Sequence, residues 1–224
     1  METYQHLMQM LALIATLRFL WRDRTDYFAG GNLTVYFSPV QKKSEDFRGP
    51  DFFVVLGVDG EKPRASWVVW EEGGRYPNVI LEILSDSTAA IDRGKKKTIY
   101  QDVFRTPEYF LFDPERLQFE GYRLVGGRYE AMVPDTAGRL HSEQLELRLG
   151  VLGGEVRFFT PDGRVVPKPE EAALEEQRRA DEQQRRADEQ QRRADEQQGR
   201  ADEQQGRAEA AEAELAALRG KVDV

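Results

Sequence analysis

The pattern of apolar and polar positions is clearest at residues 79–104, where one strand and one helix are predicted. An apolar run at positions 79–84 is typical of a strand that is buried on both faces. The run ends at Ser, Asp, Ser and Thr, residues 85–88, which are residue types common at helix N-caps. The helix predicted to follow has apolar positions at Ile91, Ile99, Tyr100, Val103 and Phe104.

Other apolar runs predict the rest of a folded domain. The N-terminal stretch has the spacing of an amphipathic helix, and arginines interrupt it before it reaches membrane length, so neither a signal peptide nor a membrane span is expected. Residues 27–32 are predicted as a turn and residues 38–49 as a polar loop. Further strands are predicted at 33–37, 50–57, 67–70, 108–114, 117–124, 129–133, 145–149 and 156–159. This order predicts an α/β fold with a mixed β-sheet flanked by helices.

A change of composition after Pro169 divides the chain into two predicted domains, residues 1–169 and 170–224. The second consists of repeats of RRADEQQ and predicts a long, charged C-terminal helix. Glutamine occupies the position where a coiled coil needs its second apolar seam, which favours a solvated single helix. A weak oligomeric coiled coil closed near Leu215 and Leu218 is the alternative.

Charge and cysteine content narrow the classes of function. The net charge is −8, of which the tail carries about −6, so residues 1–169 are almost neutral. This argues against a protein that coats nucleic acid by bulk electrostatics, although a local basic patch at 93–97 is present. The absence of cysteine excludes disulfides, thiolate metal sites and a cysteine nucleophile, and a cytoplasmic location is expected.

Two carboxylates and a nearby lysine are the residues in this chain that most suggest catalysis. Glu82 interrupts the apolar run at 79–84, and Asp51 lies at the start of another buried strand. Neighbouring strands can bring both carboxylates to one end of a sheet, where they would hold Mg²⁺ or Mn²⁺, with the backbone carbonyl of Ile83 as a third ligand. Alternatively, Glu82 is paired with a lysine of the following helix and Asp51 is a turn residue.

The segments PDFFVVLGV, VILEILSDST, DRGKKKTIY, PEYFLFDP and GYRLVGGRYE together resemble the Uma-two family of endonucleases, within the PD-(D/E)XK restriction-endonuclease-like superfamily. The resemblance runs from the first helix to Pro169 and includes the charged tail. It implies a metal site formed by Asp51 and Glu82, and a catalytic lysine four residues before a tyrosine, which is Lys96.

This sequence departs from the wider pattern in two places. Leu84 stands where the superfamily has its lysine, and Asp86 stands where the family usually has proline. Lys95 and Lys97, on either side of Lys96, make the lysine assignment ambiguous. Of the two histidines, His6 is expected on the first helix and His141 in a polar loop, and neither is expected to be catalytic or to bind zinc. His6 could still line the site, since the first helix borders the site in related folds.

The leading hypothesis is a Mg²⁺- or Mn²⁺-dependent endonuclease that hydrolyses phosphodiester bonds in DNA. A catalytically silent nuclease-like domain that binds nucleic acid or protein is the alternative, with the tail as an oligomerisation or recruitment helix. A third hypothesis is a scaffold whose tail recruits partners. By analogy with nucleases that cut both strands of a duplex, a homodimer is expected.

Overall fold

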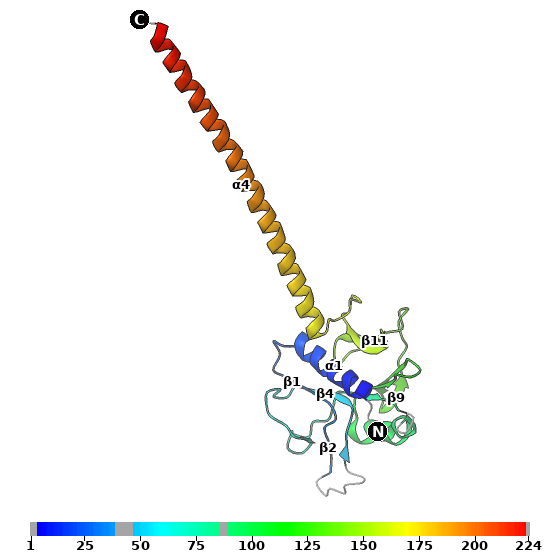
Figure 1. Cartoon of the computed structure of the whole chain (residues 1–224). Coiled ribbons are helices and arrows are strands. Elements are labelled where there is room, and N and C mark those ends of the chain that lie inside the picture. The colour runs from blue at the N-terminus through cyan, green and yellow to red at the C-terminus, as the bar shows by residue number, and fades with distance from the viewer. Residues whose placement is uncertain (1–3, 39–46, 86–88, 223–224) are drawn as a thin grey trace. The chain divides into compact units, whose positions relative to one another are not determined.

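The computed structural model describes residues 4–38, 47–85 and 89–222 (Figure 1). Contacts divide the chain into two units, residues 1–169 and residues 170–224. The first unit contains every described strand, and the second is a single helix. Each unit is described separately below.

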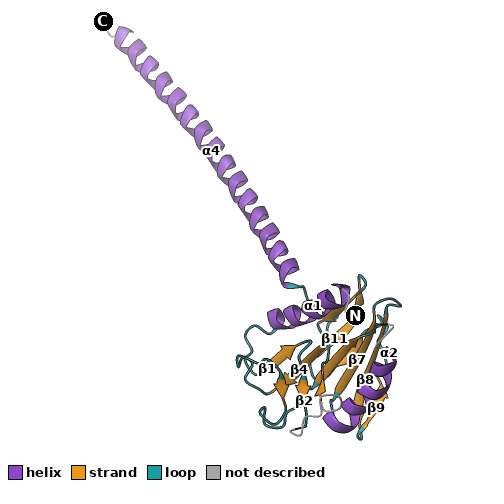
Figure 2. Cartoon of the chain, turned by 60° about the horizontal axis from the view of Figure 1, so that its bottom comes forward, coloured by secondary structure: helices purple, strands orange, loops and turns teal. Residues whose placement is uncertain are grey.

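A six-stranded mixed sheet with the order β1-β4-β6-β7-β8-β9 forms the centre of the first unit (Figure 2). Its strands are β1 (Tyr27–Gly30), β4 (Phe52–Leu56), β6 (Val79–Ile83), β7 (Glu108–Asp113), β8 (Gln118–Val125) and β9 (Arg128–Ala131). Strands β6 and β7 are parallel, and the other neighbouring pairs in this sheet are antiparallel. The parallel pair requires a crossover connection, which the central helix provides.

Two small sheets and two helical segments complete the unit. The small sheets have the orders β10-β11-β12 and β3-β2-β5. Their strands are β2 (Val35–Tyr36), β3 (Phe47–Arg48), β5 (Trp67–Val68), β10 (Leu140–Ser142), β11 (Leu147–Leu152) and β12 (Glu155–Phe159). The first helix is α1 (Tyr4–Leu20). The central helix runs without a break through α2 (Ala89–Ile91), η1 (Asp92–Lys96), α3 (Lys97–Ile99) and η2 (Tyr100–Phe104), of which η1 and η2 are π-helical.

Alternation along the strands creates one apolar core on each face of the large sheet. On one face, Leu81 and its alternate neighbours in β6 pack in a core with α1 and the β10-β11-β12 sheet. On the other face, Ile80 and Leu84 pack in a core with the central helix, including Tyr100 and Phe104. Glu82 has the same parity as Ile80 and Leu84, so alternation directs its side chain toward the central helix.

The mixed sheet flanked by helices is confirmed, but some local predictions are wrong. Strand β1 lies where a turn was predicted, because an edge strand next to β4 needs only backbone pairing. His141 was predicted in a loop, but it lies in the three-residue strand β10, which is formed by pairing with β11. Ile91, a predicted apolar position of the central helix, is 52 % exposed. The predicted polar loop at 38–49 contains the short strand β3. Residues 39–46 of this loop lie outside the described residues, and so does Asp86, which stands where the family usually has proline.

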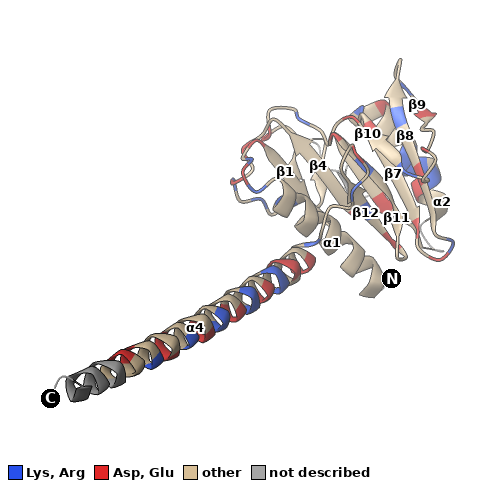
Figure 3. Ribbon diagram, turned by 90° about the horizontal axis from the view of Figure 1, so that it is seen from above, with Lys and Arg blue, Asp and Glu red and all other residues tan. Residues whose placement is uncertain are grey.

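The second unit is α4 (Pro169–Val222), a helix of 54 residues; in Figure 3 the ribbon of its described part alternates between basic (blue) and acidic (red) positions. Side chains at 173–213 are all exposed, as a helix without an apolar seam requires. The i,i+4 ion pairs Glu182–Arg186 and Glu189–Arg193 are formed along this helix, at 2.5 Å each. The side chains of Leu215 and Leu218 lie outside the described part, so the coiled coil stays an open alternative.

None of the helices in the described ranges is both long enough and apolar enough to cross a membrane.

We expect the tail to be dispensable for folding, because the first unit contains both apolar cores. A chain truncated after Pro169 should melt cooperatively, with a midpoint within about 3 °C of the full chain, as followed by circular dichroism. Loss of the cooperative transition would show that α4 contributes to the stability of the first unit.

Candidate active site

Asp51 and Glu82 lie next to each other where β4 and β6 meet at one end of the large sheet. The antiparallel register places Phe52 opposite Leu81, so the residues one step further along each strand are also opposite. The Ile83 N–H donates to Asp51 Oδ2 at 2.7 Å, and the Asp51 N–H donates to Glu82 Oε2 at 3.3 Å. Each carboxylate therefore accepts a backbone hydrogen bond from the other's strand, which fixes both side chains.

Glu82 is fully buried, with 0 % of its surface exposed, and the central helix supplies two donors to its second oxygen. The Tyr100 hydroxyl donates to Glu82 Oε1 at 2.8 Å, and Lys96 Nζ lies 3.1 Å from the same atom. Lys96 also lies 2.8 Å from Asp92 Oδ1, which makes it the centre of a buried network. A carboxylate at this depth needs such partners, because an unpaired buried charge costs several kcal/mol.

The π-helical segments explain how three residues of one helix all reach this network. Asp92, Lys96 and Tyr100 are spaced by four residues. In a regular α-helix each such step overshoots one turn by about 40°, so the three side chains would be spread over about 80°. The wider π turns, with i→i+5 hydrogen bonds, counter this drift. They keep the three side chains on one face, toward Glu82.

The electrostatics of the network leave an excess of negative charge. Burial raises the pKa of Glu82 to about 8; Lys96 opposes this shift, while Asp51 and Asp92 add to it. Burial alone would lower the pKa of Lys96, but Glu82 and Asp92 outweigh burial and raise that pKa above its ordinary value. Lys96 thus stays protonated, and one ammonium faces three carboxyl groups. An additional cation would relieve the remaining repulsion.

A cleft of about 180 Å³ lies between α1 and the ends of β6 and β7. Its lining includes Gln5, His6, Ile83, Phe112 and Glu155, but neither Asp51 nor Glu82. His6 Nε2 lies 3.0 Å from Asp51 Oδ1, and the two side chains are 12 % and 14 % exposed. The cleft is therefore connected to the network through the contact between His6 and Asp51.

The donor chemistry fits a hard divalent cation. The described ranges contain no group of three or more His, Cys, Asp or Glu side chains that could hold a metal ion. Mg²⁺ does not need one, since it binds through one or two carboxylates and keeps several waters. Asp51 and Glu82 supply two carboxylates in a region of excess negative charge. The backbone N–H of Ile83 donates a hydrogen bond to Asp51. That the backbone carbonyl of Ile83 is a metal ligand stays a prediction.

Among the three consecutive lysines, Lys96 is the one whose ammonium lies at Glu82. Lys97 Nζ lies 3.2 Å from the centre of the Tyr122 ring, and Lys95 is exposed. Sequence reasoning did not assign Asp92 and Tyr100 to the site, although their four-residue spacing from Lys96 was a usable signal. His141 lies in β10 and is exposed.

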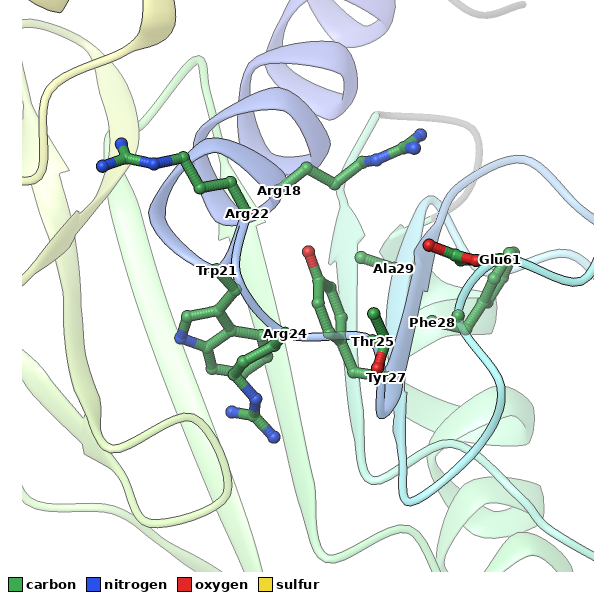
Figure 4. Close-up of a pocket in the computed structure, with 10 residues that line it drawn as sticks. Arg18, Trp21, Arg22, Arg24, Thr25, Tyr27, Phe28, Ala29 and Glu61 are labelled. Atoms are coloured by element: carbon green, nitrogen blue, oxygen red, sulfur yellow. The ribbon is translucent and has the colours of Figure 1, made fainter.

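A larger pocket of about 350 Å³ lies at the other end of α1, near Trp21 and Tyr27 (Figure 4). The side chains of Arg18 and Arg22 extend in opposite directions there. Arg24 is bound to Asp26 at 2.9 and 3.1 Å and lies 4.2 Å from the centre of the Trp21 ring. These arginines do not converge on one point, and the pocket lacks a carboxylate pair like that of Asp51 and Glu82.

The fold has a counterpart among solved structures. A crystal structure titled "a putative nuclease belonging to DUF820", from Anabaena variabilis ATCC 29413, aligns with a TM-score of 0.50 and 17 % identity. The alignment covers 67 % of this chain and 79 % of that chain, and at this identity it shows the fold alone. No curated protein matches the chain.

The family is shown by the sequence itself. A family profile described as "Putative restriction endonuclease" matches residues 3–153, which include Asp51, Glu82 and Lys96. The matched range ends at residue 153, so the expected resemblance of residues 154–169 and of the charged tail stays a prediction. Because the match covers well over half of the sequence, the chain belongs to the Uma2 family.

Proposed function

We propose that this protein is a metal-dependent endonuclease that hydrolyses phosphodiester bonds in DNA. The observation that carries the proposal is the convergence of Asp51, Glu82 and Lys96, from the start of β4, from β6 and from η1, in one network of hydrogen bonds and ion pairs. Membership of a nuclease family supports the same reaction class. Two carboxylates with an adjacent ammonium are suited to phosphoryl chemistry, in which negative charge develops on oxygen.

In this proposal Asp51 and Glu82 would hold Mg²⁺ or Mn²⁺. The bound ion would polarise the scissile phosphate and lower the pKa of a water. Lys96 would stabilise negative charge that develops on the phosphate oxygens, because its ammonium is held within 3.1 Å of Glu82. The Tyr100 hydroxyl fixes the orientation of Glu82, so that the carboxylate needs little reorganisation during the reaction.

Contacts to DNA would come from local basic residues, since the first unit is almost neutral. Arg93 and Lys95 are exposed on the same helix as Lys96. Arg93 is partly engaged by Glu120 at 2.5 Å, which leaves Lys95 as the more available cation. A homodimer, expected by analogy for cleavage of both strands, stays a prediction.

The buried Glu82–Lys96 pair also favours a second candidate, a catalytically silent nuclease-like domain in which the same residues hold β6 to the central helix. The two candidates differ in their response to metal and in the effect of removing each charge. The three predictions that follow separate them.

Replacing Lys96 tests its role in the reaction. Lys96→Met should lower metal-dependent cleavage of duplex or single-stranded DNA by about 100-fold or more while metal binding persists. Lys95→Met is the matched control and should leave turnover nearly unchanged at saturating DNA. Circular dichroism checks folding, because Lys96→Met leaves two buried carboxylates without an ammonium. Equal activity of both variants would remove Lys96 from the mechanism.

Metal binding should stabilise the fold. A free Mg²⁺ or Mn²⁺ concentration of about 100 times Kd should raise the free energy of unfolding by about 2.7 kcal/mol, measured by urea denaturation. Asp51→Asn should remove most of this gain, whereas Asp23→Asn, at an exposed carboxylate, should preserve it. A wild-type protein that gains no stability from either metal at millimolar concentration would support the silent domain.

At pH 9, above the raised pKa of about 8 at which Glu82 ionises, Glu82→Gln should raise the free energy of unfolding of the metal-free protein by about 1 kcal/mol, because burying an amide costs less than burying a carboxylate. Lys96 keeps Asp92 as its partner in this variant. Glu130→Gln, in the exposed part of β9, serves as the control and should change stability little. A loss of about 3 kcal/mol for Glu82→Gln would instead identify the Glu82–Lys96 pair as structural.

A further inference from the structure

We propose that the outward face of α1 is a dimer interface, and that its partner is a second copy of this chain packed antiparallel against it. This outer face consists of Tyr4, Met8, Leu11, Ala15 and Arg18, all of which are exposed. The inference concerns association of the protein with itself and does not depend on the proposed function.

The composition of α1 is the first argument. No Asp, Glu, Lys or Arg occurs between Tyr4 and Leu17, and Figure 3 shows most of this helix in tan. The outer face is nevertheless in contact with water, because Tyr4 is 78 % exposed, Met8 43 % and Leu11 46 %. The inward face of the helix is already packed in the domain, through Gln9, Met10, Leu13, Thr16 and Leu17. A helix that is apolar all round is normally covered on every side, and no described part of this chain covers the outer face of α1.

The spacing of the outer face favours another helix as the partner. Its residues follow one another at intervals of four, three, four and three, which is the 3.5-residue repeat of packed helices. Two copies of α1 can pair antiparallel about a point midway between Leu11 and Ala15. Leu11 of each copy then lies opposite Ala15 of the other, and Met8 opposite Arg18. A large side chain faces a small one at the centre, so the two helices can approach closely.

Charge determines the antiparallel orientation. Arg18 lies in the last turn of α1 and Arg22 follows the end of the helix, so the basic charge is confined to one end of the outer face. A parallel pair would bring the arginines of both copies together, whereas an antiparallel pair places them at opposite ends. The aliphatic stem of Arg18 can then cover Met8 while its guanidinium reaches water. The face is therefore complementary to itself in one of the two orientations.

The size of the face fits a weak, reversible dimer. α1 has 17 residues, so it is about 25 Å long and, with its side chains, about 10 Å wide. Two helices of this size bury less than the roughly 800 Å² per partner of a standard interface. Leu152, which is 47 % exposed, extends the surface, because the next two residues, Gly153 and Gly154, line a cleft together with Met8. We therefore expect a dissociation constant of about 10 μM.

The tail of this chain is a poorer match for the outer face than a second copy of α1. Apart from alanines, Leu174 is the only apolar side chain between residues 170 and 213. Covering an apolar face with charged and amide side chains removes them from water, which costs free energy, whereas two apolar faces gain free energy when they cover each other. A lipid surface is the remaining apolar partner, and it is an outcome of the experiment below.

A charge swap tests the pairing. Full-length Leu11→Glu and Ala15→Arg each place a charge at the centre of the proposed interface, and circular dichroism checks that these exposed positions leave the fold intact. Val125→Glu, at an apolar side chain that is also 46 % exposed, is the matched control. Each protein is measured by sedimentation equilibrium between about 1 and 100 μM, and the two charge variants are also mixed in equal amounts.

We expect the wild type and Val125→Glu to dimerise, and each charge variant alone to lose affinity by about 100-fold or more. The mixture of L11E and A15R should form a heterodimer, since antiparallel pairing places the introduced carboxylate beside the introduced guanidinium.

Three results would each overturn the inference: a wild type that is monomeric at about 100 μM, a dimer that L11E does not weaken, or a mixture of L11E and A15R that stays monomeric. A monomeric wild type that floats with vesicles of phosphatidylcholine and phosphatidylglycerol, when L11E does not, would overturn it as well and assign the outer face to a lipid surface.

Discussion

The free-energy cost of one buried carboxylate determines the arrangement of this end of the domain. Glu82 is fully buried within the large sheet, where an isolated charge is unstable, so its surroundings must supply donors. They come from the backbone amide of Asp51 and from two side chains of the central helix, Lys96 and Tyr100. The same contacts join β4, β6 and the helix, so the stability of this region and its proposed chemistry depend on one set of interactions.

The central helix, which supplies two of these donors, contains two π-helical segments at the residues that contact Glu82. In a regular α-helix three residues spaced by four are offset by about 80° in total, and the two π-helical segments reduce this offset. Such segments are frequent at functional sites. In this arrangement Lys96 has two carboxylate partners, Glu82 and Asp92.

The residues of the proposed site all lie in the first unit, and the tail has a different physical character. The family match ends at residue 153, before α4 begins. In α4 the side chains at 173–213 are exposed, and its i,i+4 pairs contribute only about 0.3 to 0.5 kcal/mol each. A helix of this kind is stabilised along its own length and does not depend on an apolar core.

The sequence by itself determined the mixed sheet, the identity of Asp51 and Glu82 as unusual carboxylates, and the charged helix of the tail, because each depends on local periodicity or on a charge in an apolar run. Pairing decided the rest. Strands β1 and β10 exist because neighbouring strands complete their hydrogen bonds, and their own residues carry little apolar signal. The choice of Lys96 among three lysines, and the approach of His6 to Asp51 from 45 residues away, are set by helix geometry and by packing across the sheet, which no local pattern encodes.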